Sequence, residues 1–271
     1  GGSGQLSWSF TDDLAGLADG PYTYTARVVS ETGGQGAESP GYSIVLDTTP
    51  PPGSLSITSY LDDVEPNVGE FGDGSSTNDT TPLLLGTVTG LEQGDRVLLF
   101  LGGEPLGPAV LDGMGGWSFQ IRGAAALALG PGGLSEGRHT FTAVIEDAAG
   151  NRTTSEPFTL IVDLTPPTGG SVAITYFTDD VGPVTGDFPS GAVTDDTTPL
   201  LNGTVSGLNP GDYVLIYQGA TLLPGRAVLS GDGTWTYAVT GPLDEGTHIF
   251  PAVIANDAGG EAARSPEFSL T

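Results

Sequence analysis

Apolar and polar residues alternate along most of this chain in short stretches separated by turn-forming residues. In residues 139–146, His139, Phe141, Ala143 and Ile145 would lie on one face of an extended strand. The region from residue 54 to residue 162 contains such stretches at 54–60, 82–88, 95–101, 104–111, 117–121, 139–146 and 156–162. The pattern therefore predicts an all-β structure built from short strands.

Seven short strands in about a hundred residues are typical of an immunoglobulin-like β-sandwich. A jelly roll is the alternative, but it usually needs more strands. The 44 glycines and 21 prolines suit strands joined by turns. The run 123–130 is the one helix-like stretch, and it is too short for more than a turn or two.

The chain repeats itself at a spacing of about 117 residues. Residues 57–64 match residues 174–181. The Asn-Asp-Thr-Thr-Pro that starts at Asn78 matches the Asp-Asp-Thr-Thr-Pro that starts at Asp195. The sandwich is therefore predicted to be a repeated module.

Residues before about 46 match only the second half of this repeat. Trp8-Ser9-Phe10 corresponds to Trp117-Ser118-Phe119, and residues 22–26 correspond to residues 139–143. Half a sandwich exposes unpaired strand edges and half a core, so we expect it not to be stable alone. Either the chain is cut from a longer array, with its natural N-terminus upstream, or another polypeptide completes the half module.

We therefore divide the chain into tandem immunoglobulin-like units: a C-terminal half module at 1–46 and complete modules at 47–162 and 163–271. The joints are Leu46-Asp47-Thr48-Thr49-Pro50-Pro51 and Val162-Asp163-Leu164-Thr165-Pro166-Pro167. Tandem prolines fix φ and push the preceding residue towards an extended conformation. Each joint is predicted to be stiff, so that the modules form a rod.

The formal net charge is −26, with seven basic residues, all of them arginine. Such a surface repels nucleic acid and anionic membranes and attracts cations. No apolar run is long enough to span a bilayer. The chain has no cysteine and therefore no disulfide. Extracellular modules without disulfides are commonly stabilised by bound calcium instead. For the scattered acids, an ordinary solvated surface is the favoured interpretation.

Carboxylates gather near the joints. Because successive strands of a sandwich reverse direction, the loop after the first strand lies beside the outgoing joint, and the loop before the last strand lies beside the incoming joint. The candidate metal ligands in these places are Asp47, Asp62, Asp63, Asp79, Glu146, Asp147, Asp163, Asp179, Asp180, Asp195, Asp196 and Asp257.

Two carboxylates about 4 Å apart repel by roughly 4 kcal/mol at an effective dielectric near 20, so several at one joint would force it open. Ca²⁺ reverses this effect and accepts about six to eight oxygen ligands in flexible geometry, whereas Mg²⁺ requires a tighter octahedron. We predict that Asp163 shares a Ca²⁺ site with the outgoing loop of the middle module and the incoming loop of the last module. Asp47 with Glu146 and Asp147 is predicted to form its counterpart.

The alternative for the aspartates is that they cap turns through Asx hydrogen bonds. No EF-hand loop is present, so any calcium site would be discontinuous in sequence.

Motifs of catalysis are scarce. His139 and His248 occupy equivalent positions and are expected to be core or corner residues, since the half module has Tyr22 there. The sequence contains no nucleophile elbow, zinc-ligand spacing or phosphate-binding glycine loop. We therefore expect no enzymatic activity.

The repeated tryptophans, Trp8, Trp117 and Trp235, could form a glycan platform, but core packing is the favoured interpretation. The insertion at 123–133 is unique to the middle module and is where a private function could lie.

Four motifs resemble bacterial immunoglobulin-like repeats, which build the stalks of giant type I secreted adhesins and biofilm-associated surface proteins. They are the Asp-Thr-Thr-Pro at Asp47, the Thr-Asp-Asp-Val-Gly at Thr178, the Thr-Asp-Asp-Thr-Thr-Pro at Thr194 and the Gly-Thr-Val at Gly203. The resemblance implies calcium ions at and near the joints, with the receptor-binding end elsewhere. It marks as the most transferable ligands Asp47, Asp163, Asp179, Asp180, Asp195 and Asp196.

The middle module departs from this pattern. Asn78 replaces the first aspartate of the later pair, and Val64-Glu65 lacks the glycine of Val181-Gly182. Its outgoing loop is therefore expected to bind calcium more weakly.

Together these features predict a non-enzymatic, calcium-stiffened stalk segment of an extracellular bacterial adhesin that supports cell adhesion or biofilm formation. Its partners would be the neighbouring modules and other copies of the chain, and neither nucleic acid nor the membrane interior. One alternative is a subunit of a self-assembling filament or surface layer in which a neighbour completes the half module. Another is a glycan- or host-binding module.

Overall fold

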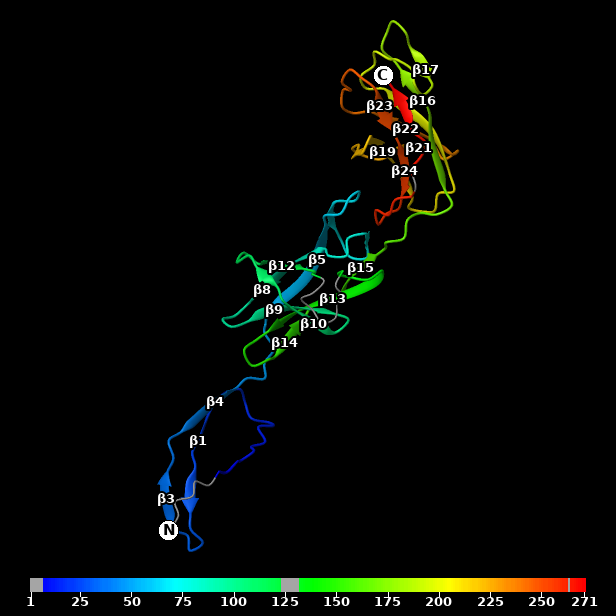
Figure 1. Cartoon of the computed structure of the whole chain (residues 1–271). Helices are drawn as coiled ribbons and strands as arrows, with labels where there is room; N and C mark the ends of the chain where they lie inside the picture. Colours follow the sequence, from blue (N-terminus) through cyan, green and yellow to red (C-terminus); the bar gives the residue numbers. More distant parts are fainter. Residues whose placement is uncertain (1–6, 123–131, 263) are drawn as a thin grey trace.

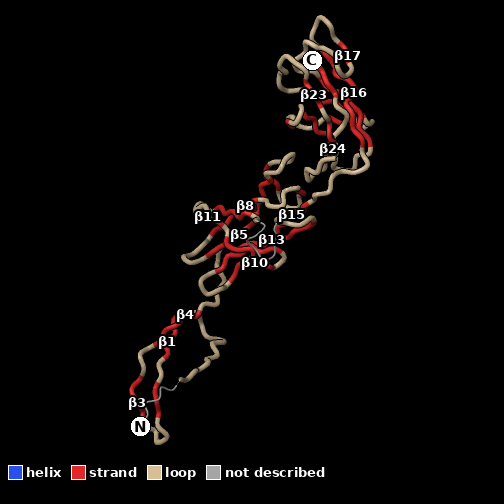
Figure 2. Tube along the Cα trace, in the orientation of Figure 1, coloured by secondary structure: helices blue, strands red, loops and turns tan. Residues whose placement is uncertain are grey.

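The computed structural model describes residues 7–122, 132–262 and 264–271. Within these ranges the chain is all-β, and its parts follow one another along an elongated molecule (Figures 1 and 2). The helix-like run at 123–130 lies outside the described residues, as does most of the insertion at 123–133. In the part of the chain that the structure describes, no helix has the length and apolar character needed to cross a bilayer.

The half module consists of two strand pairs, seen at the N-terminal end of Figure 1. They are β1 (Gly20–Tyr24) with β4 (Tyr42–Leu46), and β2 (Arg27–Val29) with β3 (Gln35–Glu38). Described residues 7–19 form no strand. Residues 7–46 therefore lack the second layer that a sandwich needs.

Exposure of its apolar residues shows the same deficit. Trp8 is 74% exposed and Tyr42 is 72% exposed, whereas their repeat equivalents Trp117 and Phe158 are 3% and 2% exposed. Core packing, expected for all three tryptophans, is thus wrong for Trp8. Its stretch has no opposing sheet to pack against.

The middle module is a sandwich of two antiparallel sheets with one parallel edge pair. One sheet has the order β11–β12–β8–β5–β6, and the other has the order β10–β9–β13–β15–β7, with β14 beside β13. The strands are β5 (Ser54–Asp62), β6 (Gly69–Phe71), β7 (Ser76–Thr77), β8 (Leu83–Thr89), β9 (Arg96–Leu101), β10 (Glu104–Pro108), β11 (Val110–Leu111), β12 (Gly116–Gln120), β13 (Gly137–Glu146), β14 (Arg152–Thr154) and β15 (Phe158–Val162).

Alternating residues of both sheets meet between the layers. Tyr60, Leu84, Leu99, Phe141 and Leu160 are fully buried there. Each such side chain contributes about 1.5–3 kcal/mol relative to an exposed position. Burial of this kind selects the register, because a shift of one residue would turn the apolar set towards solvent.

The last module has one five-stranded sheet of the same order, β17–β16–β18–β22–β21, while its second layer is divided into β20–β19–β24 and β23–β25, and these surround a core of its own. Its strands are β16 (Ser171–Asp179), β17 (Gly186–Phe188), β18 (Leu200–Ser206), β19 (Tyr213–Gln218), β20 (Thr221–Leu222), β21 (Val228–Leu229), β22 (Thr234–Ala238), β23 (His248–Phe250), β24 (Ala252–Ala255) and β25 (Phe268–Leu270). The buried residues of this core run from Val172 to Leu270, while those of the middle module run from Ile57 to Val162. The structure is thus an all-β, immunoglobulin-like sandwich repeated along the chain; the boundaries drawn at 46/47 and 162/163 stay predictions.

One contact explains why a glycine precedes each Thr-Val pair of the repeat. Trp117 lies opposite Gly86 across β12 and β8, and a Cβ on Gly86 would meet the indole at 2.1 Å. A Cβ on Gly203 would meet the indole of Trp235 at the same distance. The two tryptophans are therefore core residues, as predicted.

Candidate functional site

The site begins where β5 ends, at the outgoing end of the middle module. Asp62 is the last residue of β5 and is fully buried. Its Oδ1 accepts the N–H of Val64 at 2.9 Å, and its Oδ2 accepts the hydroxyl of Thr77 at 2.6 Å. Two carboxylate oxygens are thus fixed inside the end of the sandwich.

A second buried carboxylate follows the short strand β7. Asp79 is 1% exposed, and its Oδ1 accepts the N–H of Thr81 at 2.7 Å. Its Oδ2 is buried and has no hydrogen-bond partner among the described residues; the same is true of Asn78 Oδ1. A buried polar group left unpaired costs about 1–3 kcal/mol, and more when charged.

The charge of Asp79 acts on Asp62. Burial raises the pKa of Asp62, and the charges of Asp79 and Asp63 raise it further, against the hydrogen bonds from Thr77 and Val64 that lower it. Negative charge is therefore unfavourable here in the protein alone. A cation would reverse the sign of this term.

The joint is connected to both modules at this place. The N–H of Asp163 donates to Thr77 O at 2.9 Å, next to the parallel pairing of β7 with β15. From the last module, Asn256 Nδ2 donates to Asp163 Oδ2 at 3.2 Å and to Thr165 O at 3.1 Å. Asp163 is thus joined through its backbone to Thr77 of the middle module and through its side chain to the incoming loop of the last module. The shared cation site at this joint stays a prediction.

The last module carries the same arrangement at its outgoing end. Asp179 Oδ1 accepts the N–H of Val181 at 2.9 Å, and its Oδ2 accepts the hydroxyl of Thr194 at 2.5 Å. Asp196 Oδ1 accepts the N–H of Thr198 at 2.8 Å. Asp179 and Asp196 are 3% and 4% exposed. Each module therefore buries its own acid pair.

The first joint is arranged differently. The amide of Asn151 donates to Asp47 O at 3.1 Å and to Asp147 Oδ2 at 2.9 Å, so Asp47 and Asp147 do lie together. Glu146 does not join them. It is held by the guanidinium groups of Arg96 and Arg152, each at 2.5 Å.

Glu146 therefore already has two positive partners, and these lower its pKa, the hydrogen bond from Arg96 being the largest cause. The remaining predicted ligands lie near the surface. Asp63, Asp180 and Asp195 are exposed, and Asp257 is 3.8 Å from Arg226. Among the described residues, no three acidic or histidine side chains converge in the manner of a complete metal cage.

The Asx-turn alternative is present too, but it accounts for only part of the geometry. Asp62 Oδ1, Asp79 Oδ1 and Asp163 Oδ1 each accept an N–H from two residues further on. Such turns use one oxygen each. Asx turns do not explain the burial of Asp62 or the unpartnered Oδ2 of Asp79. Both features suit a bound cation that is coordinated by oxygen ligands.

Sequence reasoning missed the residues that tie these acids together. Thr77 and Thr194 bridge the acid pairs, while Asn151 and Asn256 hold the joints. The repeat could have indicated Thr77 and Thr194, because the motif Thr-Asx-Asp begins at each of them. Asn256 lies next to Asp257 in the loop that the sequence places beside the incoming joint, whereas nothing in the sequence indicated Asn151.

The histidines occupy corners of the sheets. His139 Nε2 lies 2.7 Å from Ser135 O, and His248 Nε2 lies 2.7 Å from Asp244 O. Both rings join the start of a strand to the loop before it. This agrees with the corner role predicted for them.

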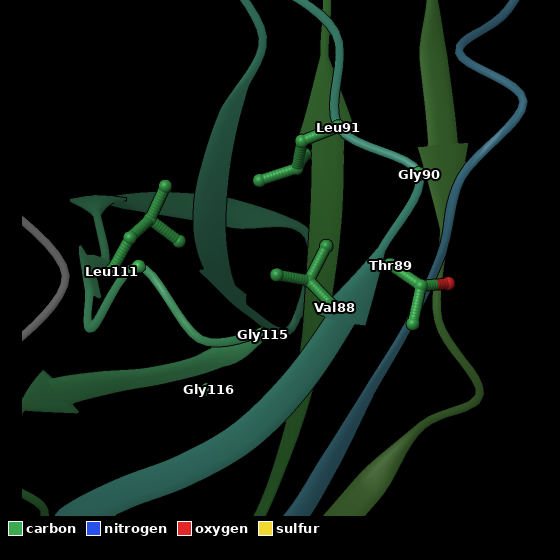
Figure 3. A pocket seen from close by; sticks show the side chains of 8 residues that line it. Val88, Thr89, Gly90, Leu91, Leu111, Gly115 and Gly116 are labelled. Carbon is green, nitrogen blue, oxygen red and sulfur yellow. The ribbon is translucent and has the colours of Figure 1, made fainter.

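Two shallow hollows occur on the middle module. Figure 3 shows the first, of about 220 Å³, where Val88, Leu91 and Leu111 face one another beside glycine backbone. The second, of about 360 Å³, is bordered by Glu70 and Trp117. Trp117 is 3% exposed, so it offers no open aromatic face to a sugar ring.

Comparison with known proteins agrees with this architecture. Residues 62–164 match the family model described as "Bacterial Ig-like domain". That range begins at Asp62 and ends just after Asp163, so it includes the middle module's acid pair and the joint aspartate. Domains with this fold are typically structural and non-catalytic. No curated protein matches the chain.

Three solved structures illustrate the likeness. Fibronectin(III)-like modules of CbhA from Clostridium thermocellum are 13% identical, with a TM-score of 0.40 over 80% of this chain and 92% of theirs. A 1.5-MDa bacterial ice-binding adhesin is 20% identical, with a TM-score of 0.35 over 95% and 74%. A tetra-tandem repeat from the extending region of a large adhesion protein is 17% identical, with a TM-score of 0.25 over 95% and 57%. At these values the likeness carries no functional argument.

Proposed function

We propose that this chain is a non-enzymatic stalk segment of an extracellular bacterial adhesin, in which Ca²⁺ bound at the module ends stiffens the joints. The observation that carries the proposal is the buried carboxylate of Asp79, whose Oδ2 has no partner among the described residues. It lies next to Asp62, and the same acid pair recurs as Asp179 and Asp196. The match of residues 62–164 to a bacterial Ig-like domain supports the cellular setting.

At the second joint the ion would be held by Asp62 and Asp79, with Asp163 and the amide oxygen of Asn78 as further donors. Bound there, Ca²⁺ supplies positive charge to acids that otherwise repel each other. The protein contributes the rest through its own bonds. Thr77 orients Asp62 and anchors Asp163, and Asn256 ties Asp163 to the next module. A loss of bending freedom at the joint follows.

The test is small-angle scattering with thermal unfolding, on the full chain in Ca²⁺ and then in excess chelator. A ligand at a hundred times its Kd stabilises the folded state by about 2.7 kcal/mol, which is readily seen as a rise in Tm. We expect chelation to shorten or bend the particle and to lower Tm, and Mg²⁺ not to restore either. Unchanged shape and Tm would show that the aspartates are only turn caps and acidic surface.

A second candidate rests on the half module. Its open apolar face, with Trp8 at 74% exposure, is what a neighbouring polypeptide would have to cover in a filament or surface layer. Concentration-dependent growth of the scattering mass, independent of Ca²⁺, would favour this candidate over the stalk.

A further inference from the structure

The loop between β5 and β6 of the middle module reaches the last module directly (Figure 1). The side-chain amide of Asn67 donates to Asp257 O at 2.9 Å. Its carbonyl oxygen accepts the hydroxyl of Tyr213 at 2.9 Å and a guanidinium N–H of Arg226 at 3.4 Å. One side chain thus uses both ends of its amide across the joint.

The surface that receives Asn67 is organised by the last module itself. The guanidinium of Arg226 lies over the ring of Tyr213, 3.4 Å from its centroid, and 3.8 Å from Asp257. Tyr213 is 5% exposed. Because these groups already hold one another, little side-chain freedom remains to be lost when Asn67 binds.

The backbones approach closely beside this contact. A Cβ added to Gly259 would lie 3.0 Å from Pro66 Cδ and 3.0 Å from Asn78 Nδ2. Asn78 Nδ2 donates to Glu65 O at 3.0 Å and to Gly259 O at 3.4 Å. Gly259 has φ +89, a conformation that suits glycine and leaves room for the opposing loop.

Comparison of the two repeats shows that this contact is specific to one joint. At equivalent positions, Asn67 is replaced by Val184 in the last module, and Tyr213 is replaced by Arg96 in the middle module. Valine can neither donate nor accept the bonds described, and Arg96 is engaged with Glu146. The loop and its receiving surface therefore match only in the observed order.

We propose that Asn67 and the surface formed by Tyr213, Arg226, Asp257 and Gly259 are a cation-independent latch. The latch fixes the orientation of the middle and last modules, and it encodes which module follows which. It goes beyond the calcium proposal, because its bonds join neutral and cationic groups of the protein and require no ion.

The experiment measures the distance between the two modules in the full chain. Since the protein has no cysteine, Val110→Cys and Val228→Cys place one spin label on each module, at repeat-equivalent positions that are 70% and 68% exposed. Electron–electron double resonance is recorded in excess chelator and again in Ca²⁺. In chelator the labelled parent should show a narrower distance distribution than a variant without the latch, and Ca²⁺ should narrow the distributions of both.

Two variants break the latch from opposite sides. Asn67→Val installs the residue that the last module has at this place, and Tyr213→Phe removes only the hydroxyl. Each lost hydrogen bond should lower the ratio of latched to released joints by about fivefold, which broadens the distribution. The double variant should be no broader than Asn67→Val alone, because both changes remove the same contact.

Val184→Asn is the matched control and should leave the distribution unchanged. Circular dichroism verifies that each variant retains its sheets. Equal widths for the parent and for Asn67→Val in chelator would overturn the latch. This comparison is separate from the test of the calcium site, which depends on the difference between Ca²⁺ and chelator and not on Asn67.

Discussion

Asp79 has one carboxylate oxygen in an Asx turn and the other buried without a partner among the described residues. Asp79→Asn removes the charge and keeps the size and the Oδ1 acceptor. We expect the variant in chelator to be as stable as the parent or more stable, since an unfavourable buried charge is gone. In Ca²⁺ it should fail to gain the stability that the parent gains, as measured by Tm in both conditions.

Asp63→Asn is the control for that change, because Asp63 adjoins the same site but is exposed. It should keep most of the gain. If Asp79→Asn responds to Ca²⁺ as fully as the parent does, the ion does not bind at this carboxylate.

At the residue scale, the sequence predicts which acids lie at the ends of the modules but not what each of them does. Asp62 and Asp79 lie at the outgoing end of the middle module, and the backbone of Asp163 bonds to Thr77 there, but no three acidic side chains of the described residues converge. Glu146 was expected to join a cation site, yet it binds Arg96 and Arg152. Those two arginines lie 56 positions apart, and their meeting depends on the pairing of β9, β13 and β14, which local pattern does not specify.

At the scale of the strands, Glu146 links β9 to β14, because its carboxylate binds Arg96 of β9 and Arg152 of β14. The guanidinium groups lower its pKa in the folded state, so its contribution to stability is present above the unfolded pKa and is lost as pH falls through the folded pKa. Glu146→Gln should cost about 1–3 kcal/mol at neutral pH. It should also flatten the loss of stability that the parent shows as pH falls below about 4.3, the ordinary pKa of a glutamate. Urea unfolding at a series of pH values measures both effects.

Glu156→Gln, at an exposed position, is the control. Its free energy of unfolding should fall at acid pH as much as that of the parent. An unchanged pH profile in Glu146→Gln would mean that the two arginines do not stabilise the carboxylate in solution.

Long strands were predictable and short ones were not. All seven predicted stretches of the middle module contain observed strands, because four or more alternating residues define a face. β6, β7 and β14 have only two or three residues each, which is too short to show an alternation of apolar and polar residues. β7 matters most for the site, since its parallel pairing with β15 brings Thr77 to the joint, and that pairing is set by the sandwich as a whole.

For the whole molecule, the half module should be its weakest part. Two-stranded pairs without a second layer are marginal in water, and Arg27 lies in one of them. Brief trypsin treatment of the native chain should therefore cut after Arg27 well before it cuts after Arg96 or Arg152, which lie in the larger sheets of the middle module. Mass spectrometry of the early products measures the order. In urea the three sites should be cut at comparable rates, and equal rates in the native chain would contradict the expectation.

The placement of β5 and β15 determines how a module would carry a pulling force. The chain enters the middle module through β5 at one end and leaves through β15 at the other, and these strands lie along the module (Figure 1). Tension between the joints therefore acts along the strands, across the hydrogen bonds that β15 makes with β13 and β7. Bonds loaded in this direction share the load and must yield together, whereas bonds pulled open from one end yield one after another.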